Sequence, residues 1–507
     1  MKRAVAAVVL CLVVCKLLIH LYSGGYYGYF VDELYYIACS RHLDWGYVDQ
    51  PPLIALIVWF AHALAGDSLR GFRVLAAVAG AGEVALTALI ARELGGGRFA
   101  QGFAALATLC APAILSIDGF LSMNAFEPLF WLGCAWVVVR IVNTGDQRLW
   151  IWFGVLAGFG LQNKYSMGIF GLGVVVGVIL TPVRRAFLSP WFWAAGLIAF
   201  AIFLPNLLWN IRHHFPFLEL QANIRRSGRD TPLGPLAFFG QEALAMSPLS
   251  APLWLGGLWF CFFSDTGKRF RVLGWAWVVT AGVIVAMSPR IYYLFPAFPL
   301  LFAGGAVAWE AWFAKIRLGA SRLRFAWPVL LAATSVVLAP LAIPVLPPET
   351  YVRYTNAIHL APPALERHKL GPLPQIFADE FGWDDMAATV ARVYNGLPAD
   401  VRARTAIFGQ NYGEAGAIDM FGPRYGLPGA ISGHQNYFFW GPRGYTGDSW
   451  IVMDDRPERL QRIFTEVHKA ATVYNKWQMA YRNFDVYYCR GMKMPVSELW
   501  PQVKNWD

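Results

Sequence analysis

The chain has 507 residues, of which 57% are hydrophobic and only 15% are charged. A soluble protein carries nearer a quarter of charged residues, so this composition indicates a protein that lies in lipid. The formal net charge is +10, but much of the excess Lys and Arg falls in short connecting loops. No basic stripe with interleaved aromatic residues is present, which argues against nucleic acid as a partner.

The apolar segments of the chain recur from the N-terminus to about residue 346. The first follows Met1-Lys2-Arg3 and lacks an Ala-x-Ala cleavage site, so we expect an uncleaved helix rather than a signal peptide. Residues 51–65 are apolar but short, which favours an interfacial or re-entrant helix. We predict about eleven transmembrane helices, over residues 4–22, 70–94, 99–117, 122–142, 148–163, 166–182, 189–210, 248–264, 271–288, 292–313 and 326–346.

The connecting loops give an orientation for these helices. Every second loop is basic, beginning with Lys2 and Arg3, as the positive-inside rule requires. An odd number of spans then places the C-terminus outside the cytoplasm. We therefore expect a transmembrane domain over residues 1–346, which includes a first outer loop at 23–69, and an extracytoplasmic domain over 347–507.

The last 150 or so residues are polar and rich in Gly, Pro and aromatics. Residues 384–394 have helical spacing, with Asp384 as the expected cap. Residues 405–408 and 449–453 are typical of short buried strands. The sequence thus predicts a polytopic α-helical membrane protein with a C-terminal soluble α/β domain.

Polar residues gather at the outer ends of the predicted helices. Ionisable groups at membrane depth are costly, so a set of them on one side indicates a functional site. Each could instead cap a helix or pair at the interface, and Lys164 could snorkel from a helix end. The set comprises Asp32, Glu33, Asp49, Asp118, Asn124, Glu127, Lys164, Arg290, Tyr292 and Tyr293.

The first outer loop carries the most distinctive pattern. Asp32-Glu33-Leu34-Tyr35-Tyr36, followed by Gly46-Tyr47-Val48-Asp49-Gln50-Pro51-Pro52-Leu53, resembles the first outer loop of bacterial GT-C glycosyltransferases. These are relatives of protein O-mannosyltransferases and of the lipid A aminoarabinose transferase. Further stretches resemble the same family at residues 122–131, 163–166, 290–299, 411–415 and 432–435.

This resemblance implies a GT-C fold and a glycosyltransferase that uses a polyprenyl-phosphate-linked sugar. Transfer would proceed with inversion, on the outer face of a bacterial inner membrane, to a lipid, glycan or protein acceptor. No metal and no other cofactor is implied. The C-terminal domain would cap the site or recognise the acceptor, unless it is a passive lid.

The resemblance also assigns roles to individual residues. Asp32 would be the general base, and Glu33 and Glu127 would position acceptor or sugar, with Asp49, Asp118 and Asn124 as further substrate-binding residues. Lys164, Arg290 and Gln50 would bind the donor phosphate, and Tyr35, Tyr36, Tyr292 and Tyr293 would line the sugar pocket. Some relatives carry Lys or His where this chain has Gln50, which gives more weight to Lys164 and Arg290, or to Arg225, Arg226 and Arg229.

Two other classes of protein remain open. A multi-pass transporter of a lipid or polar solute would favour midplane charges and internal repeat symmetry, whereas here the charges sit at helix ends and no repeat is visible. A non-catalytic assembly or receptor subunit would tolerate Asp32→Asn, whereas an enzyme would lose nearly all turnover.

Overall fold

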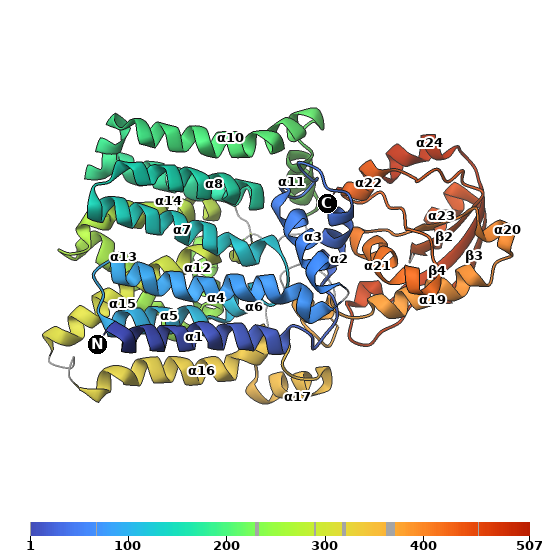
Figure 1. Ribbon diagram of the computed structural model, residues 1–507. Helices are drawn as coiled ribbons and strands as arrows, with labels where there is room; N and C mark the ends of the chain where they lie inside the picture. The colour runs from blue at the N-terminus through green and yellow to red at the C-terminus, as the bar shows by residue number, and fades with distance from the viewer. Residues whose placement is uncertain are drawn as a thin grey trace. The chain divides into compact units, whose positions relative to one another are not determined.

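The computed structural model describes residues 2–66, 68–228, 233–287, 290–316, 321–360, 371–454 and 456–506. The chain divides into two units (Figure 1). The first comprises Met1–Gly25, Arg70–Trp209 and Pro232–Val345. The second comprises Tyr26–Leu69, Asn210–Thr231 and Leu346–Asp507. The first outer loop is thus grouped with the C-terminal region, whereas the sequence prediction placed it in the transmembrane domain by its position in the chain.

The first unit is a bundle whose long helices run side by side (Figure 1). Its helices are α1 (Lys2–Ser23), α4 (Leu69–Glu93), α5 (Arg98–Cys110), α6 (Pro112–Ile117), α7 (Met123–Thr144), α8 (Trp150–Asn163), α9 (Ser166–Ile179), α10 (Pro190–Arg212), α12 (Pro235–Ala245), α13 (Ala251–Phe263), α14 (Arg271–Met287), α15 (Phe298–Lys315) and α16 (Ala326–Ala342). Short 3-10 helices join them at η1 (Gln147–Leu149), η2 (Pro182–Leu188), η3 (Pro248–Ser250), η4 (Lys268–Phe270), η5 (Ile291–Tyr293), η6 (Phe295–Ala297) and η8 (Arg322–Phe325).

All eleven predicted membrane segments are helical, but they do not all have the length of a span. Within the described residues, seven helices are long and apolar enough to cross a membrane, or up to nine if each of two bent pairs is one span. Helix α8 has 14 residues, which at 1.5 Å per residue reaches about 21 Å and falls short of a hydrocarbon layer of about 30 Å. The predicted span at 99–117 is interrupted where α5 ends and Pro112 begins α6. The count of eleven is therefore not confirmed.

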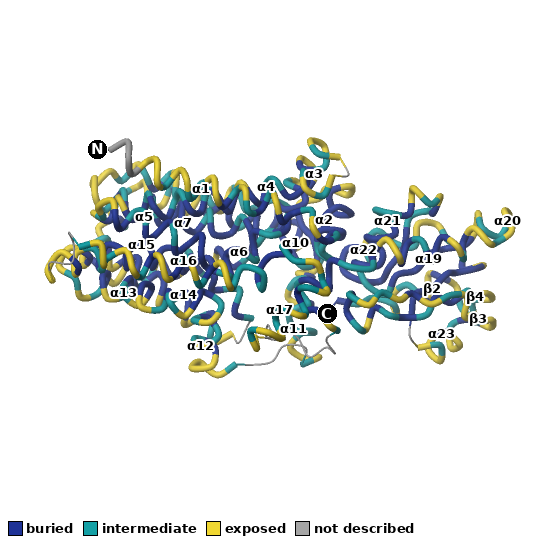
Figure 2. Tube along the Cα trace, turned by 90° about the horizontal axis from the view of Figure 1, so that it is seen from below, coloured by how far each residue is buried: buried dark blue, intermediate teal, exposed yellow. Residues whose placement is uncertain are grey.

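Burial within the first unit separates central from peripheral helices (Figure 2). In the apolar stretch that contains α15, 89% is buried inside the protein. In the apolar stretches of α1, α10 and α16, the buried shares are only 17%, 11% and 22%. Large apolar side chains such as Leu197 and Val336 lie exposed on the peripheral helices. Such surfaces suit contact with lipid, because acyl chains are as apolar as the side chains themselves.

The second unit contains a four-stranded mixed sheet with the order β1-β2-β4-β3. Its strands are β1 (Thr405–Phe408), β2 (Ser449–Asp454), β3 (Phe464–Thr472) and β4 (Asp485–Met492). β1 pairs parallel to β2, and β4 runs antiparallel to both β2 and β3. The two strands predicted from sequence are confirmed, and β3 and β4 were missed. The α/β character of this region is confirmed.

The second unit also contains helices, and those of the first outer loop are among them. They are α2 (Val31–Arg41), α3 (Leu53–Ala65), α11 (Pro216–Ser227), α17 (Pro348–Ile358), α18 (Gln375–Ala378), α19 (Trp383–Asn395), α20 (Ala399–Arg402), α21 (Tyr412–Phe421), α22 (Asn436–Trp440), α23 (Pro457–Ile463) and α24 (Val496–Leu499), with 3-10 turns η9 (Gly422–Tyr425), η10 (Ala480–Arg482) and η11 (Trp500–Val503). The short apolar helix expected at 51–65 is α3, with 13 residues.

The helix predicted at 384–394 is α19, but its cap differs from the expectation. Gly382, at φ 84°, occupies the N-cap position. Asp384 lies in the first turn, where its carboxylate accepts a hydrogen bond of 2.9 Å from the Tyr425 hydroxyl and pairs with Arg424. A left-handed backbone favours glycine, so the chain enters this helix through Gly382 and leaves Asp384 to bind side chains.

Candidate functional site

Asp32 lies in the first turn of α2, where its carboxylate accepts a hydrogen bond from the Tyr412 hydroxyl at 2.7 Å. Tyr412 is the first residue of α21, whose N-cap Asn411 accepts a hydrogen bond of 3.0 Å from the Glu414 amide. Asn is among the residues that best satisfy the open amides of a helix start. The capped start of α21 therefore fixes the backbone from which Tyr412 reaches Asp32.

Two glycines let α21 lie close against α2. A Cβ atom on Gly416 would stand 3.0 Å from the backbone carbon and oxygen of Leu34, and one on Gly413 would stand 2.5 Å from a methyl of Val31. At the other end of the pair, the Arg41 guanidinium donates to the Asp419 carbonyl at 2.9 Å. The two helices thus run in the same direction, and their close packing sets the distance between Asp32 and Tyr412.

A second carboxylate, Asp49, lies beside this pair. Its Oδ1 accepts a hydrogen bond of 3.1 Å from Tyr35, and the Tyr35 hydroxyl in turn accepts one of 3.3 Å from the Asn436 amide. Burial, and then the negative charge of Asp32, raises the pKa of Asp49 to about 7. The negative charge of a neighbouring carboxylate disfavours ionisation of Asp49, so Asp49 binds its proton more tightly than an exposed aspartate does.

The aromatic rings of this network are stacked. The ring centroids of Tyr35 and Tyr412 are 4.7 Å apart, and those of Tyr412 and His434 are 4.9 Å apart. The Nδ1 atom of His434 also accepts a hydrogen bond of 3.1 Å from the Tyr412 backbone amide. Tyr412 is therefore stacked against two rings and held at its backbone.

Three other residues predicted from the first loop, Glu33, Gln50 and Tyr36, are buried and contact residues of the same loop. The Glu33 carboxylate is buried and accepts a hydrogen bond of 2.8 Å from the Phe30 amide, as a helix-capping side chain does. Gln50 is buried, and its Nε2 lies 4.0 Å from the Cys39 sulfur. Tyr36 is buried in α2, with its ring centroid 6.1 Å from that of Tyr35.

In the first unit, several predicted residues gather around Lys164. Its Nζ donates to Glu127 at 2.7 Å and to Asn124 at 2.8 Å, and the other oxygen of Glu127 accepts from Ser166. Asn124 and Glu127 are three residues apart on α7, so they face the same way, as expected from the sequence. The Lys164 side chain is only 7% exposed.

Two tyrosines complete this cluster. The Lys164 ammonium lies 5.0 Å from the ring centroid of Tyr292 and 4.6 Å from that of Tyr293, which are cation–π distances. The two rings are themselves stacked at 4.7 Å. Arg290 is half-buried and is the N-cap residue of η5, the 3-10 turn that carries both tyrosines.

Asp118 lies in another cluster of the first unit. Its carboxylate pairs with Lys16 at 2.7 Å, and both side chains are fully buried. Glu83 shares this cluster. The ion pair joins α1 to the end of α6, and none of the hydrogen bonds or ion pairs described for Asp118 reaches the residues around Lys164.

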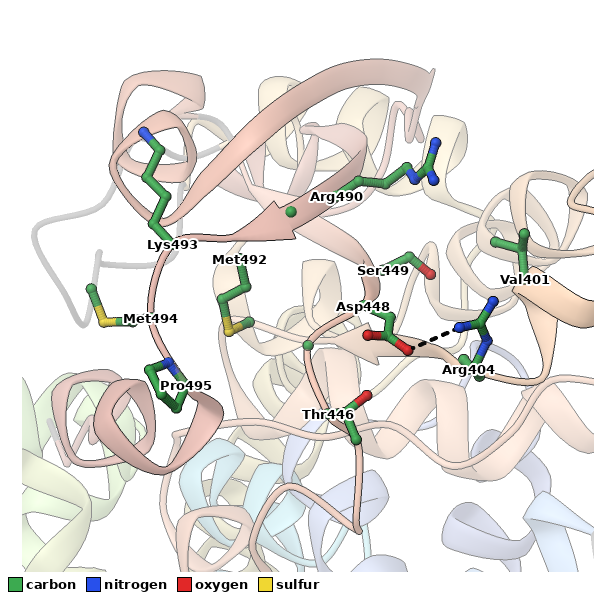
Figure 3. A pocket seen from close by; sticks show the side chains of 12 residues that line it. Val401, Arg404, Thr446, Asp448, Ser449, Arg490, Met492, Lys493, Met494 and Pro495 are labelled. Carbon is green, nitrogen blue, oxygen red and sulfur yellow. Dashed lines mark hydrogen bonds and ion pairs between the residues drawn. The ribbon is translucent and has the colours of Figure 1, made fainter.

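Two pockets lie in the second unit. One, of about 610 Å³, is lined by the loops that precede β2 and follow β4, and contains the exposed ion pair of Arg404 and Asp448 at 3.2 Å (Figure 3). The other, of about 230 Å³, lies at the end of α2 and is lined by Arg41, His42 and Arg443, among others. Within the described part of the chain, no group of three or more His, Cys, Asp or Glu side chains is arranged to hold a metal ion.

Some residues of these networks were given no role from the sequence. Tyr412 and His434 fall in stretches that resemble the family, but the resemblance alone assigned them nothing. Ser166 likewise falls in such a stretch without an assigned role, and Asn436 lies just outside one. Contacts such as that of Tyr412 with Asp32 join positions 380 residues apart, and a single sequence carries no signal for them.

The fold is that of a polytopic α-helical membrane protein with a C-terminal α/β region. The chain matches the family model for dolichyl-phosphate-mannose-protein mannosyltransferase over residues 49–209. It is 24% identical over 262 residues to the lipid A galacturonosyltransferase RgtD of Rhizobium johnstonii, across 49% of this chain and 52% of that protein. The chain thus aligns with about half the length of this relative.

Solved structures share the fold over most of the chain. The structure of ArnT from Cupriavidus metallidurans bound to undecaprenyl phosphate has a TM-score of 0.59 at 15% identity, covering 94% of this chain and 97% of that one. An oligosaccharyltransferase from Archaeoglobus fulgidus, tethered with an acceptor peptide, has a TM-score of 0.52 at 14% identity, covering 88% of this chain and 69% of that one. At these identities, the likeness establishes the fold.

Proposed function

We propose that this protein is a glycosyltransferase that moves a sugar from a polyprenyl-phosphate donor to a lipid, glycan or protein acceptor, with inversion. The observation that carries the proposal is the Asp32 carboxylate, which accepts a hydrogen bond from Tyr412 and lies beside a second carboxyl, Asp49, whose pKa is raised to about 7. The family match and the undecaprenyl phosphate bound to ArnT, a protein with the same fold, support the donor class. We place the reaction on the extracytoplasmic side of a bacterial inner membrane, following the basic loops.

On the acceptor side, Asp32 acts as the general base. It takes the proton of the acceptor hydroxyl or amine while the oxygen or nitrogen of that group attacks the anomeric carbon of the sugar. The new bond forms while the bond from the anomeric carbon to the phosphate oxygen breaks, through an oxocarbenium-like state. A single displacement of this kind inverts the anomeric centre and releases polyprenyl phosphate.

On the donor side, Lys164 and Arg290 stabilise the charge that develops on the leaving phosphate. A fixed cation in a site that excludes water acts strongly on such a charge. The Lys164 charge is paired with Glu127 and held by Asn124, so these two residues position the ammonium. Tyr292 and Tyr293 form an aromatic wall beside it.

The class of acceptor is suggested by a relative and by one pocket of the second unit. RgtD acts by its name on lipid A, which makes a glycolipid the first acceptor to test, with a peptide as the contrast. The pocket formed by Arg41, His42 and Arg443 suits an anionic group on such an acceptor, because its cations outnumber its one carboxylate, Asp419.

A transporter is the rival function. It is disfavoured because two pairs of buried charges in the first unit, Lys164 with Glu127 and Lys16 with Asp118, are neutralised locally. The resemblance to transferases over both units also argues against it.

The proposal is tested by transfer of label from a radiolabelled undecaprenyl-phosphate sugar in membranes that contain the protein. Wild-type protein should transfer label to a lipid fraction, and Asp32→Asn should not. Asp400→Asn, an exposed carboxylate of the same unit, is the matched control and should behave as wild type. Uptake of a labelled solute into proteoliposomes, with no transfer in membranes, would favour the transporter instead.

A further inference from the structure

We propose that Tyr412 is a positioning residue for the base, so that the C-terminal region supplies part of the catalytic machinery. The inference rests on the proposed function, because it requires Asp32 to be the base. It assigns to the region after residue 346 an active role, in place of a passive cover over the site.

The first support is the hydrogen bond itself. The Tyr412 hydroxyl is 2.7 Å from Asp32 Oδ1, a short distance of the kind seen for hydrogen bonds to charged acceptors. A donor at one oxygen restricts rotation of the carboxylate about its terminal torsion, which is otherwise broad. A base whose lone pairs point in one direction is better aligned with the proton it removes.

The second support is the restraint on Tyr412. Its ring stacks against those of Tyr35 and His434, with centroid distances of 4.7 and 4.9 Å. Tyr35 is in turn fixed by Asp49 and by Asn436. A phenol stacked against two rings has little freedom to leave Asp32, so the hydrogen bond is preorganised.

The third support is the local backbone. Gly413 and Gly416 lie one and four residues after Tyr412. Gly413 lies against Val31 and Gly416 against Leu34, on either side of Asp32 in α2. The helix start that carries Tyr412 is thereby docked onto the helix start that carries Asp32. Both ends of the hydrogen bond are set by one helix–helix contact.

Titratable groups lie on several of the elements around Asp32. Asp49 follows α2, Tyr35 lies on α2, Tyr412 and Glu414 lie on α21, and His434 precedes α22. A hydrogen bond to the charged form of a carboxylate lowers its pKa. Removal of the Tyr412 hydroxyl should therefore raise the pKa of Asp32.

The experiment compares Tyr412→Phe with wild type in the full-length protein, by the same transfer assay over a range of pH. Phe keeps a ring that stacks with Tyr35 and His434 and removes only the hydroxyl. We expect kcat to fall by about tenfold or more, acceptor KM to stay within about twofold, and the acidic limb of the kcat/KM profile to move to higher pH. A merely structural tyrosine would not move that limb.

Tyr425→Phe is the matched control. Tyr425 also donates to an aspartate, Asp384, at 2.9 Å in the same unit, and its loss should leave kcat and the pH profile unchanged. His434→Phe is a second variant, which keeps a stacked ring but removes the acceptor of the Tyr412 amide. It should move the acidic limb in the same direction by a smaller amount.

The inference is overturned if Tyr412→Phe and His434→Phe both match wild type in kcat and in the position of the acidic limb while Asp32→Asn is inactive. That result would leave the proposed function standing. If Asp32→Asn itself keeps full turnover, the base assignment fails, and the positioning role fails with it.

Discussion

Lys164 and Glu127 form a buried ion pair of 2.7 Å in the first unit, and their side chains are only 7% and 2% exposed. Each carries a charge that is costly to leave alone away from water. The proposed role of Lys164 on the donor phosphate therefore depends on Glu127, which holds the ammonium in place and offsets its charge while no donor is bound.

Lys164→Met should lower both donor binding and stability. The donor KM should rise at least tenfold, because a cation is removed from the phosphate. The buried Glu127 would lose its partner, at a cost of about 3–5 kcal/mol. Both effects can be measured in detergent, by transfer kinetics and by thermal unfolding.

The two effects separate in the double variant Lys164→Met, Glu127→Gln. Stability should largely return, since no charge is left buried, whereas donor KM should stay high. Lys268→Met, which removes an exposed lysine from its pair with Asp265, serves as the control. Recovery of donor binding in the double variant would show that Lys164 only neutralises Glu127.

Gly416→Ala tests the contact between α2 and α21. The new Cβ would meet the Leu34 backbone at 3.0 Å, so the helices must separate slightly. We expect a loss of about 1–3 kcal/mol, as for overpacking in a core, and a fall in kcat as Tyr412 moves from Asp32. Gly396→Ala adds a Cβ with no contact below 3.3 Å and should leave kcat unchanged. A Gly416→Ala enzyme with wild-type stability and kcat would contradict the tight contact.

Asp49 and Glu414 should make the stability of the second unit depend on pH. Burial is the main cause that raises the pKa of each carboxyl to about 7 in the folded protein, from 3.8 and 4.5. The folded state then binds protons more tightly than the unfolded state, so stability from these groups is present below about pH 4 and is lost as pH rises to about 7.

The check is the unfolding temperature of the purified protein between pH 5 and 8. In Asp49→Asn and in Glu414→Gln, the unfolding temperature should fall less steeply as the pH rises, because neither amide titrates. Asp400→Asn should keep the wild-type slope. A slope that is unchanged in both site variants would rule out these carboxyls as its source.

The sequence predicted the class of fold because composition and hydrophobic run lengths are local properties. It also placed β1 and β2, which are short runs of buried residues, and α19, whose apolar residues have helical spacing. It missed β3, where exposed positions outnumber buried ones. It predicted one continuous span over 99–117, where α5 ends before Pro112, because apolar composition does not reveal where a helix breaks.

The grouping around the candidate site was predictable only in part. Asn124 and Glu127 share a face by their spacing, and the structure brings both to Lys164. For Glu33, the sequence also allowed helix capping as an alternative to a role in a site, and the structure shows that Glu33 caps α2. The Tyr412 contact with Asp32 was not predictable, because it depends on how α21 docks on α2 through two glycines.

The most direct test of the central claim is transfer from a radiolabelled undecaprenyl-phosphate sugar by purified wild-type protein and by Asp32→Asn, with donor binding measured on both. The account predicts that Asp32→Asn binds the donor normally and loses about 10²- to 10⁴-fold in transfer rate, as expected for loss of a general base. Transfer by Asp32→Asn at the wild-type rate would contradict it.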